Sequence, residues 1–175
     1  MARLPLVSEQ THPDRAELIG RIRAERGRLL NLYGTLLHSP PVAEGWLRLL
    51  TAVRQQASLA GDVRELAILR VALVNGADYE FRTHVPFALR EGFAQAQIDA
   101  LGSWRESGLF NARYMAVLAY VDSMTRDIHV PDAVFEPLRA HFGAQELVEL
   151  TVTVAAYNMV SRFLEALQVD LDGKS

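Results

Sequence analysis

Glu80 and His84 are the two residues whose types and spacing most directly suggest chemistry. They lie four positions apart in the stretch NGADYEFRTH, directly after the most apolar run of the first half of the chain. On a helix, residues at this spacing share one face and can hydrogen-bond. A neighbouring carboxylate favours the protonated imidazole and burial favours the neutral ring, and a histidine balanced between them suits proton transfer. The pair therefore predicts general acid–base chemistry.

Two other interpretations of this pair stay open on the sequence alone. The first is structural: a surface ion pair worth roughly a few tenths of a kcal/mol, or a core histidine satisfied by a neighbour. The second is a metal site, because Glu and His are both metal ligands. A metal needs further ligands, and no motif brings in the other histidines, which are His12, His38, His129 and His141. We therefore predict no metal.

The elements that must position these residues are predicted to be helices. The stretch GDVRELAILRVALVNG predicts one helix, in which Asp62 and Glu65 form a capping box and Gly76 ends it. A capping role alone would explain Glu65. A second helix is predicted from about Asp78 to Glu91. Because their connection is short, the two helices should run antiparallel and bring Glu65 near His84.

Helical periodicity, punctuated by Gly, Pro, Asp and Ser, extends over the rest of the chain. It predicts a helix from Asp14 to about Asn31, one beginning after Ser39, and a long final one within AQELVELTVTVAAYNMVSRFLEALQ. The β-branched run Thr151–Val154 favours a strand by propensity, but the length and flanks of its segment favour a helix. The expected fold is an all-α bundle of about seven or eight helices.

Composition limits the class of protein. With 50% hydrophobic residues, 22% charged residues and a net charge of -3, the chain resembles a soluble globular protein. It lacks the basic surplus of a nucleic-acid binder, so no nucleic-acid partner is expected. No apolar run has the length of a signal peptide core or a membrane span, which predicts a cytoplasmic protein without a membrane partner. The 175 residues suit one domain, 1–175, with 1–13 as an N-terminal arm.

The stretch ELAILRVALVNGADYEFRTHVPFALREGFAQAQIDAL resembles the signature region of the carboxymuconolactone decarboxylase and AhpD-like family. RGRLLNLYGTLLHSPPVAEGW before it and YNMVSRFLEALQVDLD after it are also similar to members of this family. The resemblance implies an AhpD-like helical bundle that assembles as a homo-oligomer. The candidate interfaces are the N-terminal arm and the C-terminal helix with Tyr157, Met159 and Phe163.

The resemblance also implies a set of site residues. In the thiol-dependent branch of the family, a glutamate, a Cys-x-His-Cys segment and a later histidine form a proton relay. The glutamate corresponds to Glu65 and the last histidine to His84, nineteen residues further on. Ala77 and Glu80 hold the places of the two thiols, and Tyr79 that of the intervening histidine. The chain has no cysteine, so disulfide-based peroxidase chemistry is excluded. What remains is an acid–base set with Tyr79 as a further donor.

This set is similar to the decarboxylase-type branch, whose members act without metal or organic cofactor on small carboxylated lactones or β-keto acids. We therefore expect a cofactor-independent lyase on a small organic acid, in an apolar pocket between helices. His84 would deliver the proton and Glu80 would orient the imidazole. Arg82 and Arg70 are the nearest candidate anchors for an anionic substrate, although both can equally be solvated. The alternative is a non-catalytic protein that uses the scaffold for small-ligand binding or assembly.

Overall fold

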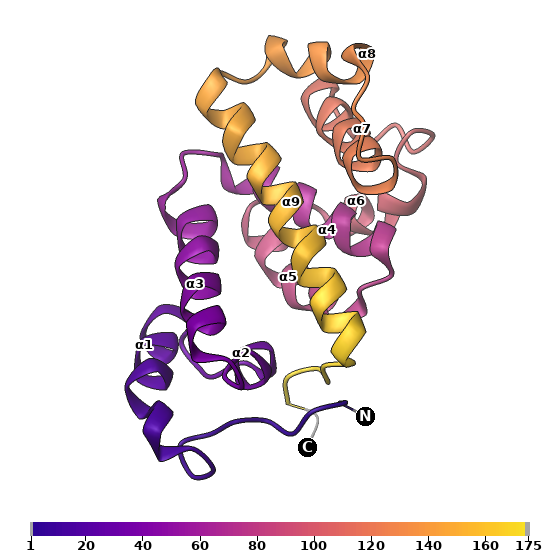
Figure 1. The fold of residues 1–175 in the computed structure, drawn as a ribbon. Coiled ribbons are helices and arrows are strands. Elements are labelled where there is room, and N and C mark those ends of the chain that lie inside the picture. The colour runs from indigo at the N-terminus through magenta and orange to yellow at the C-terminus, as the bar shows by residue number, and fades with distance from the viewer. Residues whose placement is uncertain (1, 174–175) are drawn as a thin grey trace. The chain divides into compact units, whose positions relative to one another are not determined.

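The computed structural model describes residues 2–173, and every regular element in this part of the chain is a helix (Figure 1). The prediction of an all-α fold is confirmed. The α-helices are α1 Ala16–Arg26, α2 Asn31–Leu36, α3 Pro40–Thr51, α4 Gly61–Asn75, α5 Asp78–Arg90, α6 Gln95–Asp99, α7 Ala112–Arg126, α8 Asp132–Phe135 and α9 Ala144–Leu167. A π-helical segment, Ala52–Gln56, follows α3, and 3-10 turns lie at Pro13–Arg15, Ala100–Ser103 and Glu136–Ala140.

The contacts within the chain divide it into two compact units. The first contains the residues up to Gln56 and those from Phe163 onward, and the second contains Ala57–Arg162. In the first unit the N-terminal arm lies beside the C-terminal segment, where the amide of Arg3 donates to the carbonyl of Leu167 at 3.0 Å. All the predicted site residues lie in the second unit. A single domain with 1–13 as its arm stays a prediction.

α4 and α5 form a helical hairpin in the second unit. α4 ends because Gly76 takes a φ of +66°, the left-handed conformation that a residue without a Cβ adopts easily. Residues that meet across the hairpin lie about equally far from this turn, as Glu65 does with His84 and Gly61 with Glu91. The two helices are therefore antiparallel, and the predicted closeness of Glu65 and His84 is confirmed.

The start of α4 is held by α7. The hydroxyl of Tyr114 donates to Asp62 at 2.7 Å, and burial together with this hydrogen bond raises the pKa of Tyr114 to about 12. The predicted capping box of Asp62 and Glu65 is wrong, because α4 begins at Gly61 after Ala60 and no side chain caps it. Both carboxylates are used in tertiary contacts instead.

The first helix is shorter than predicted. A 3-10 turn at Pro13–Arg15 precedes α1, and α1 ends where Gly27 takes a φ of +79°. The segment up to Asn31 is therefore not one helix, and α2 begins there. Gly27 lies inside the range over which apolar residues recur at helical spacing. That spacing continues beyond Gly27, so the sequence predicted one helix where the structure has two.

α9 is one continuous helix through the β-branched run Thr151–Val154. The hydroxyl of Thr151 donates to the carbonyl of Leu147 at 2.6 Å, and that of Thr153 to the carbonyl of Glu149 at 2.7 Å. Both polar groups are thus satisfied inside the helix. None of the helices among residues 2–173, α9 included, combines the length and hydropathy that crossing a bilayer requires.

Candidate active site

His84 lies between two carboxylates, one beside each ring nitrogen. Oε2 of Glu65 is 2.6 Å from Nδ1 and Oε2 of Glu80 is 3.4 Å from Nε2. The side chains of His84, Glu65 and Glu80 are only 3%, 2% and 4% exposed. Buried charged groups are costly unless they are paired and hydrogen-bonded. The three residues therefore form one buried polar unit, which we call the Glu–His–Glu cluster.

Two different elements bring the cluster together. Glu80 and His84 are one helical turn apart on α5, as their spacing predicts. Glu65 comes from α4, across the hairpin. The sequence predicted that Glu80 orients the imidazole, but the shorter contact is made by Glu65. Because a carboxylate accepts the Nδ1 hydrogen, Glu65 fixes the ring and leaves Nε2 directed toward Glu80.

Aromatic rings border the imidazole. The ring of Tyr157, on α9, meets it edge-on with centroids 5.1 Å apart and an interplanar angle of 89°. Phe87 lies one helical turn further along α5, with centroids 5.5 Å apart. Tyr79 is also buried, at 5% exposed, in the first turn of α5, and its role as a proton donor stays a prediction. These neighbours make the surroundings of His84 largely apolar.

Tyr157 was missed by the sequence as a site residue. It was considered for an interface, but it is 3% exposed and contacts His84 within the chain, so it is not available to a partner. No local pattern links it to His84, because the two lie on helices far apart in the sequence. Only the packing of α9 on α5 reveals this contact.

Arg64 is a second residue that the sequence did not single out. Its Nε lies 3.3 Å from Oε1 of Glu65, the oxygen that does not face His84. Its Nη2 lies 3.8 Å from Oε1 of Glu91. The adjacent position of Arg64 and Glu65 was a signal, since a cation beside a candidate catalytic carboxylate can hold it ionised.

The two arginines predicted to anchor a substrate contact other residues. Arg70 is 4% exposed; its Nε donates to Asp122 at 2.6 Å and its Nη1 to the carbonyl of Leu101 at 2.7 Å. The Arg82 side chain is 63% exposed and pairs with Asp78 on the same helix at 2.8 Å. The expectation of a solvated side chain thus holds for Arg82 and is wrong for Arg70. Neither set of contacts points to the Glu–His–Glu cluster.

Asp122 is the centre of a buried polar network between α4 and α7. Besides Arg70, it accepts hydrogen bonds from Nε1 of Trp104 and from Arg105, both at 3.2 Å. Burial by itself would raise the pKa of Asp122, but the hydrogen bond and charge of Arg70, the hydrogen bond of Trp104 and the charge of Arg126 together outweigh burial, and the pKa is lowered. The burial of Arg70 is therefore explained by its pairing with Asp122, without a role in substrate binding.

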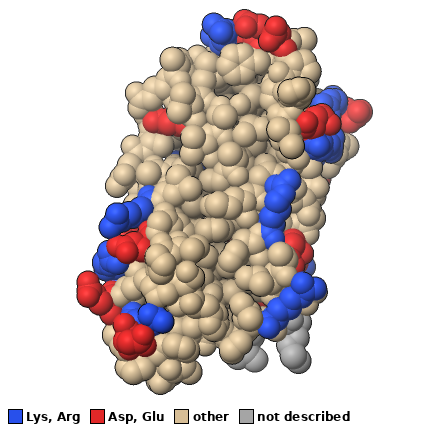
Figure 2. Space-filling model, viewed as in Figure 1, with Lys and Arg blue, Asp and Glu red and all other residues tan. Residues whose placement is uncertain are grey.

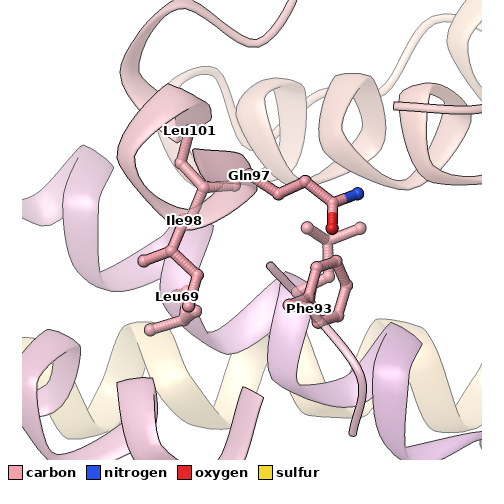
Figure 3. Close-up of a pocket in the computed structure, with 6 residues that line it drawn as sticks. Leu69, Phe93, Gln97, Ile98 and Leu101 are labelled. Atoms are coloured by element: carbon pink, nitrogen blue, oxygen red, sulfur yellow. The ribbon is translucent and has the colours of Figure 1, made fainter. Parts of the chain in front are cut away.

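Figure 3 shows a pocket in the second unit, and one of its lining residues, Leu101, accepts a hydrogen bond from Arg70 through its carbonyl. Its lining is mostly apolar and consists of Leu66, Leu69, Phe93, Gln97, Ile98 and Leu101. Its one polar side chain is satisfied, because the amide of Gln97 donates to the carbonyl of Leu109 and accepts from the amide of Ala94. This pocket does not match the substrate pocket expected from the sequence.

The chemistry open to the cluster is proton transfer. With Nδ1–H bound to Glu65, one further proton can reside on Nε2 or on Glu80. Within residues 2–173, no group of three or more His, Asp or Glu side chains has an arrangement suited to a metal ion. The cluster therefore offers a proton carrier with an orienting carboxylate on one side and a second carboxylate on the other.

Comparisons with known proteins identify the family. Residues 40–123 match the profile of the carboxymuconolactone decarboxylase family. The protein YnjA of Escherichia coli is 30% identical over 131 residues, which are 74% of this chain and 69% of that protein.

Solved structures agree. A protein of unknown function from Agrobacterium tumefaciens, named as a candidate antioxidant defence protein AhpD, superposes with a TM-score of 0.73 and 28% identity over 78% of this chain and 94% of that one. The debrominase Bmp8 in complex with 2,3,4-tribromopyrrole gives a TM-score of 0.81 over 99% of this chain and 95% of that chain, and at 15% identity this shows the fold alone. The chain belongs to the carboxymuconolactone decarboxylase family and has the AhpD-like fold, without the cysteines of its thiol-dependent members.

Proposed function

We propose that this protein is an acid–base enzyme of the decarboxylase type, acting on a small carboxylated lactone or keto acid without a metal or organic cofactor. The observation that carries the proposal is the placement of His84 between two buried carboxylates, one at each ring nitrogen. An imidazole held in one orientation, with a proton acceptor on its far side, is the arrangement that proton delivery requires.

The reaction needs a proton at one defined moment. When the bond between the carboxylate carbon and its neighbour breaks, CO₂ leaves and the electron pair is delocalised onto the adjacent carbonyl. The resulting carbanion takes a proton from the Nε2–Glu80 pair of the cluster, and water later restores that proton. Glu65 stays bound to Nδ1 throughout and stabilises the positive charge of the protonated ring. No electron transfer is needed, which fits a chain without cysteine.

The residue type at position 80 supports acid–base chemistry rather than peroxide chemistry. In the thiol-dependent branch that the sequence resembles, a cysteine stands at this position. A carboxylate cannot form a disulfide, but it can exchange a proton with an imidazole. The acid–base part of the relay is therefore preserved in residue type while the redox part is absent.

The size of the proposed substrate is supported by a structural relative. Bmp8, which has the same fold, was solved with 2,3,4-tribromopyrrole, a small ring. A small cyclic acid is in the same size range.

The second candidate function is a non-catalytic small-ligand or assembly protein, and it is favoured by the closed state of the site. His84 is 2% exposed, and it does not line the pocket of Figure 3. A buried cluster of this kind can serve purely to hold α4 against α5. In that case no substrate would reach Nε2.

Turnover separates the two functions. The purified protein is incubated with a panel of small carboxylated lactones and β-keto acids, and CO₂ release is recorded beside Arg82→Met, whose side chain is exposed on the same helix as His84. The proposal expects release from at least one compound, by wild type and Arg82→Met alike. Binding of compounds without any CO₂ release would favour the ligand-binding function.

A further inference from the structure

The Glu65 carboxylate uses its two oxygens for different partners. Oε2 accepts from Nδ1 of His84 at 2.6 Å, and Oε1 accepts from Nε of Arg64 at 3.3 Å. A carboxylate held at both oxygens cannot rotate without breaking one of these contacts. Arg64 therefore contacts the oxygen of this carboxylate that does not face His84.

Arg64 is itself held on its other side. Its side chain is 15% exposed, and Nη2 lies 3.8 Å from Oε1 of Glu91, just beyond the end of α5. The Glu91 carboxylate rests on Gly61, the first residue of α4: a Cβ there would lie 2.3 Å from its carboxyl carbon. The absence of a side chain at position 61 is what leaves room for this carboxylate.

We propose that Arg64 is a positioning residue of the site, held by Glu91 seated on Gly61, and that it orients His84 through Glu65. The effect of Arg64 on catalysis rests on the proposed function, but its effect on the orientation of the His84 ring can be measured without turnover. The line of contacts runs from the half-exposed Glu91 to the buried imidazole. A negative group at the first turn of α4 also gains from the helix dipole, which stabilises the Glu91 end of the line.

Gly61→Ala offers a test that leaves the contact residues themselves unchanged. The new methyl group would collide with the Glu91 carboxylate, which ends a flexible side chain and can swing away at little cost to the fold. Arg64 would then lose its outer partner. Gly45→Ala is the matched control, because a Cβ at position 45 meets nothing within 4 Å.

The readout is the Nδ1–H resonance of His84 in proton–nitrogen NMR spectra of the full chain. Arg64→Met and Gly61→Ala should move this resonance upfield and speed its exchange with water, because the hydrogen bond to Glu65 becomes longer and less fixed. Arg64→Lys, which keeps the charge, should recover part of the shift. Gly45→Ala should leave the resonance at its wild-type position.

An unchanged resonance in both Arg64→Met and Gly61→Ala would overturn the inference. If Arg64→Met does not fold, Gly61→Ala and Arg64→Lys still decide it. If the protein turns over none of the tested compounds, the proposed function is wrong. The NMR result does not depend on turnover, so it tests this inference separately.

Discussion

At the scale of single residues, the central feature is an imidazole with a carboxylate beside each nitrogen. The closeness of Glu80 and His84 on α5 could be predicted from their spacing alone, because residues three or four positions apart lie on the same face of a helix. Glu65 could be placed nearby through the short connection at Gly76. What the sequence could not assign was which carboxylate bonds which nitrogen, because this depends on side-chain conformations across the hairpin.

Replacing Glu65 should show how much the cluster depends on an acceptor at Nδ1. Glu65→Gln keeps a carbonyl oxygen in reach of the ring, whereas Glu65→Ala leaves a buried N–H donor without its acceptor. We expect Glu65→Ala to be less stable than Glu65→Gln by about 2–4 kcal/mol, measured by urea unfolding at neutral pH. Equal stability of the two variants would mean that the hydrogen bond at 2.6 Å contributes little to the fold.

At the scale of elements, α4 contributes to the polar contacts with both α5 and α7 in the second unit. It meets α5 through Glu65, and α7 through Asp62 and Arg70. The hairpin partner could be predicted from sequence because it is adjacent. The α7 partner could not, because Asp122 lies 52 positions from Arg70 and nothing in the local pattern joins them. The mistaken capping box has the same cause: Asp62 and Glu65 have the right spacing, but tertiary partners hold them.

Arg70 and Arg82 are a matched pair for testing this difference. Arg70→Met leaves Asp122 buried beside fewer donors and should lower the free energy of unfolding by about 3–5 kcal/mol. Arg82→Met removes only an exposed pair on one helix and should change it by less than about 1 kcal/mol. Chemical denaturation of both variants measures this. If both variants lose a similar free energy of unfolding, burial of the Arg70–Asp122 pair adds no stability beyond that of an exposed pair.

The buried pair of Arg70 and Asp122 predicts how the free energy of unfolding depends on pH. The folded-state pKa of Asp122 is lowered below its ordinary value of 3.8, so its contribution is present above that pH and is lost as the pH falls through the folded-state pKa. The stability gap between wild type and Asp122→Asn should therefore be constant near neutral pH and shrink in acid, as followed by urea unfolding over a pH series. A gap that grows on acidification would contradict the assignment.

At the scale of the whole molecule, α9 presents an exposed apolar row of Val148, Val152 and Met159, which are 63%, 37% and 37% exposed. Figure 2 shows few charged side chains along α9 itself. Residues four and seven apart share one helix face, and exposed apolar patches of this kind often mark contact sites between chains. Of the residues that the sequence assigned to an interface on this helix, Tyr157 is buried and Met159 is exposed, and a role for Phe163 stays a prediction.

This row gives the predicted homo-oligomer a specific test. Light scattering at micromolar concentration should report a multiple of the 19.5 kDa chain mass, and Val152→Glu should shift the mass toward 19.5 kDa. Val42→Glu, at a valine of α3 that is 52% exposed, should keep the wild-type mass. A wild-type particle of one chain would refute the oligomer.

The measurement that tests the central claim most directly is the turnover number of His84→Gln against that of wild type, on whichever acid the panel identifies. If the Glu–His–Glu cluster carries the proton, kcat should fall by about 100-fold or more, while Glu80→Gln, which leaves the ring held by Glu65, should lose less. The thermal unfolding of His84→Gln should confirm that the protein is folded. A kcat for folded His84→Gln close to that of wild type would contradict proton transfer by this cluster.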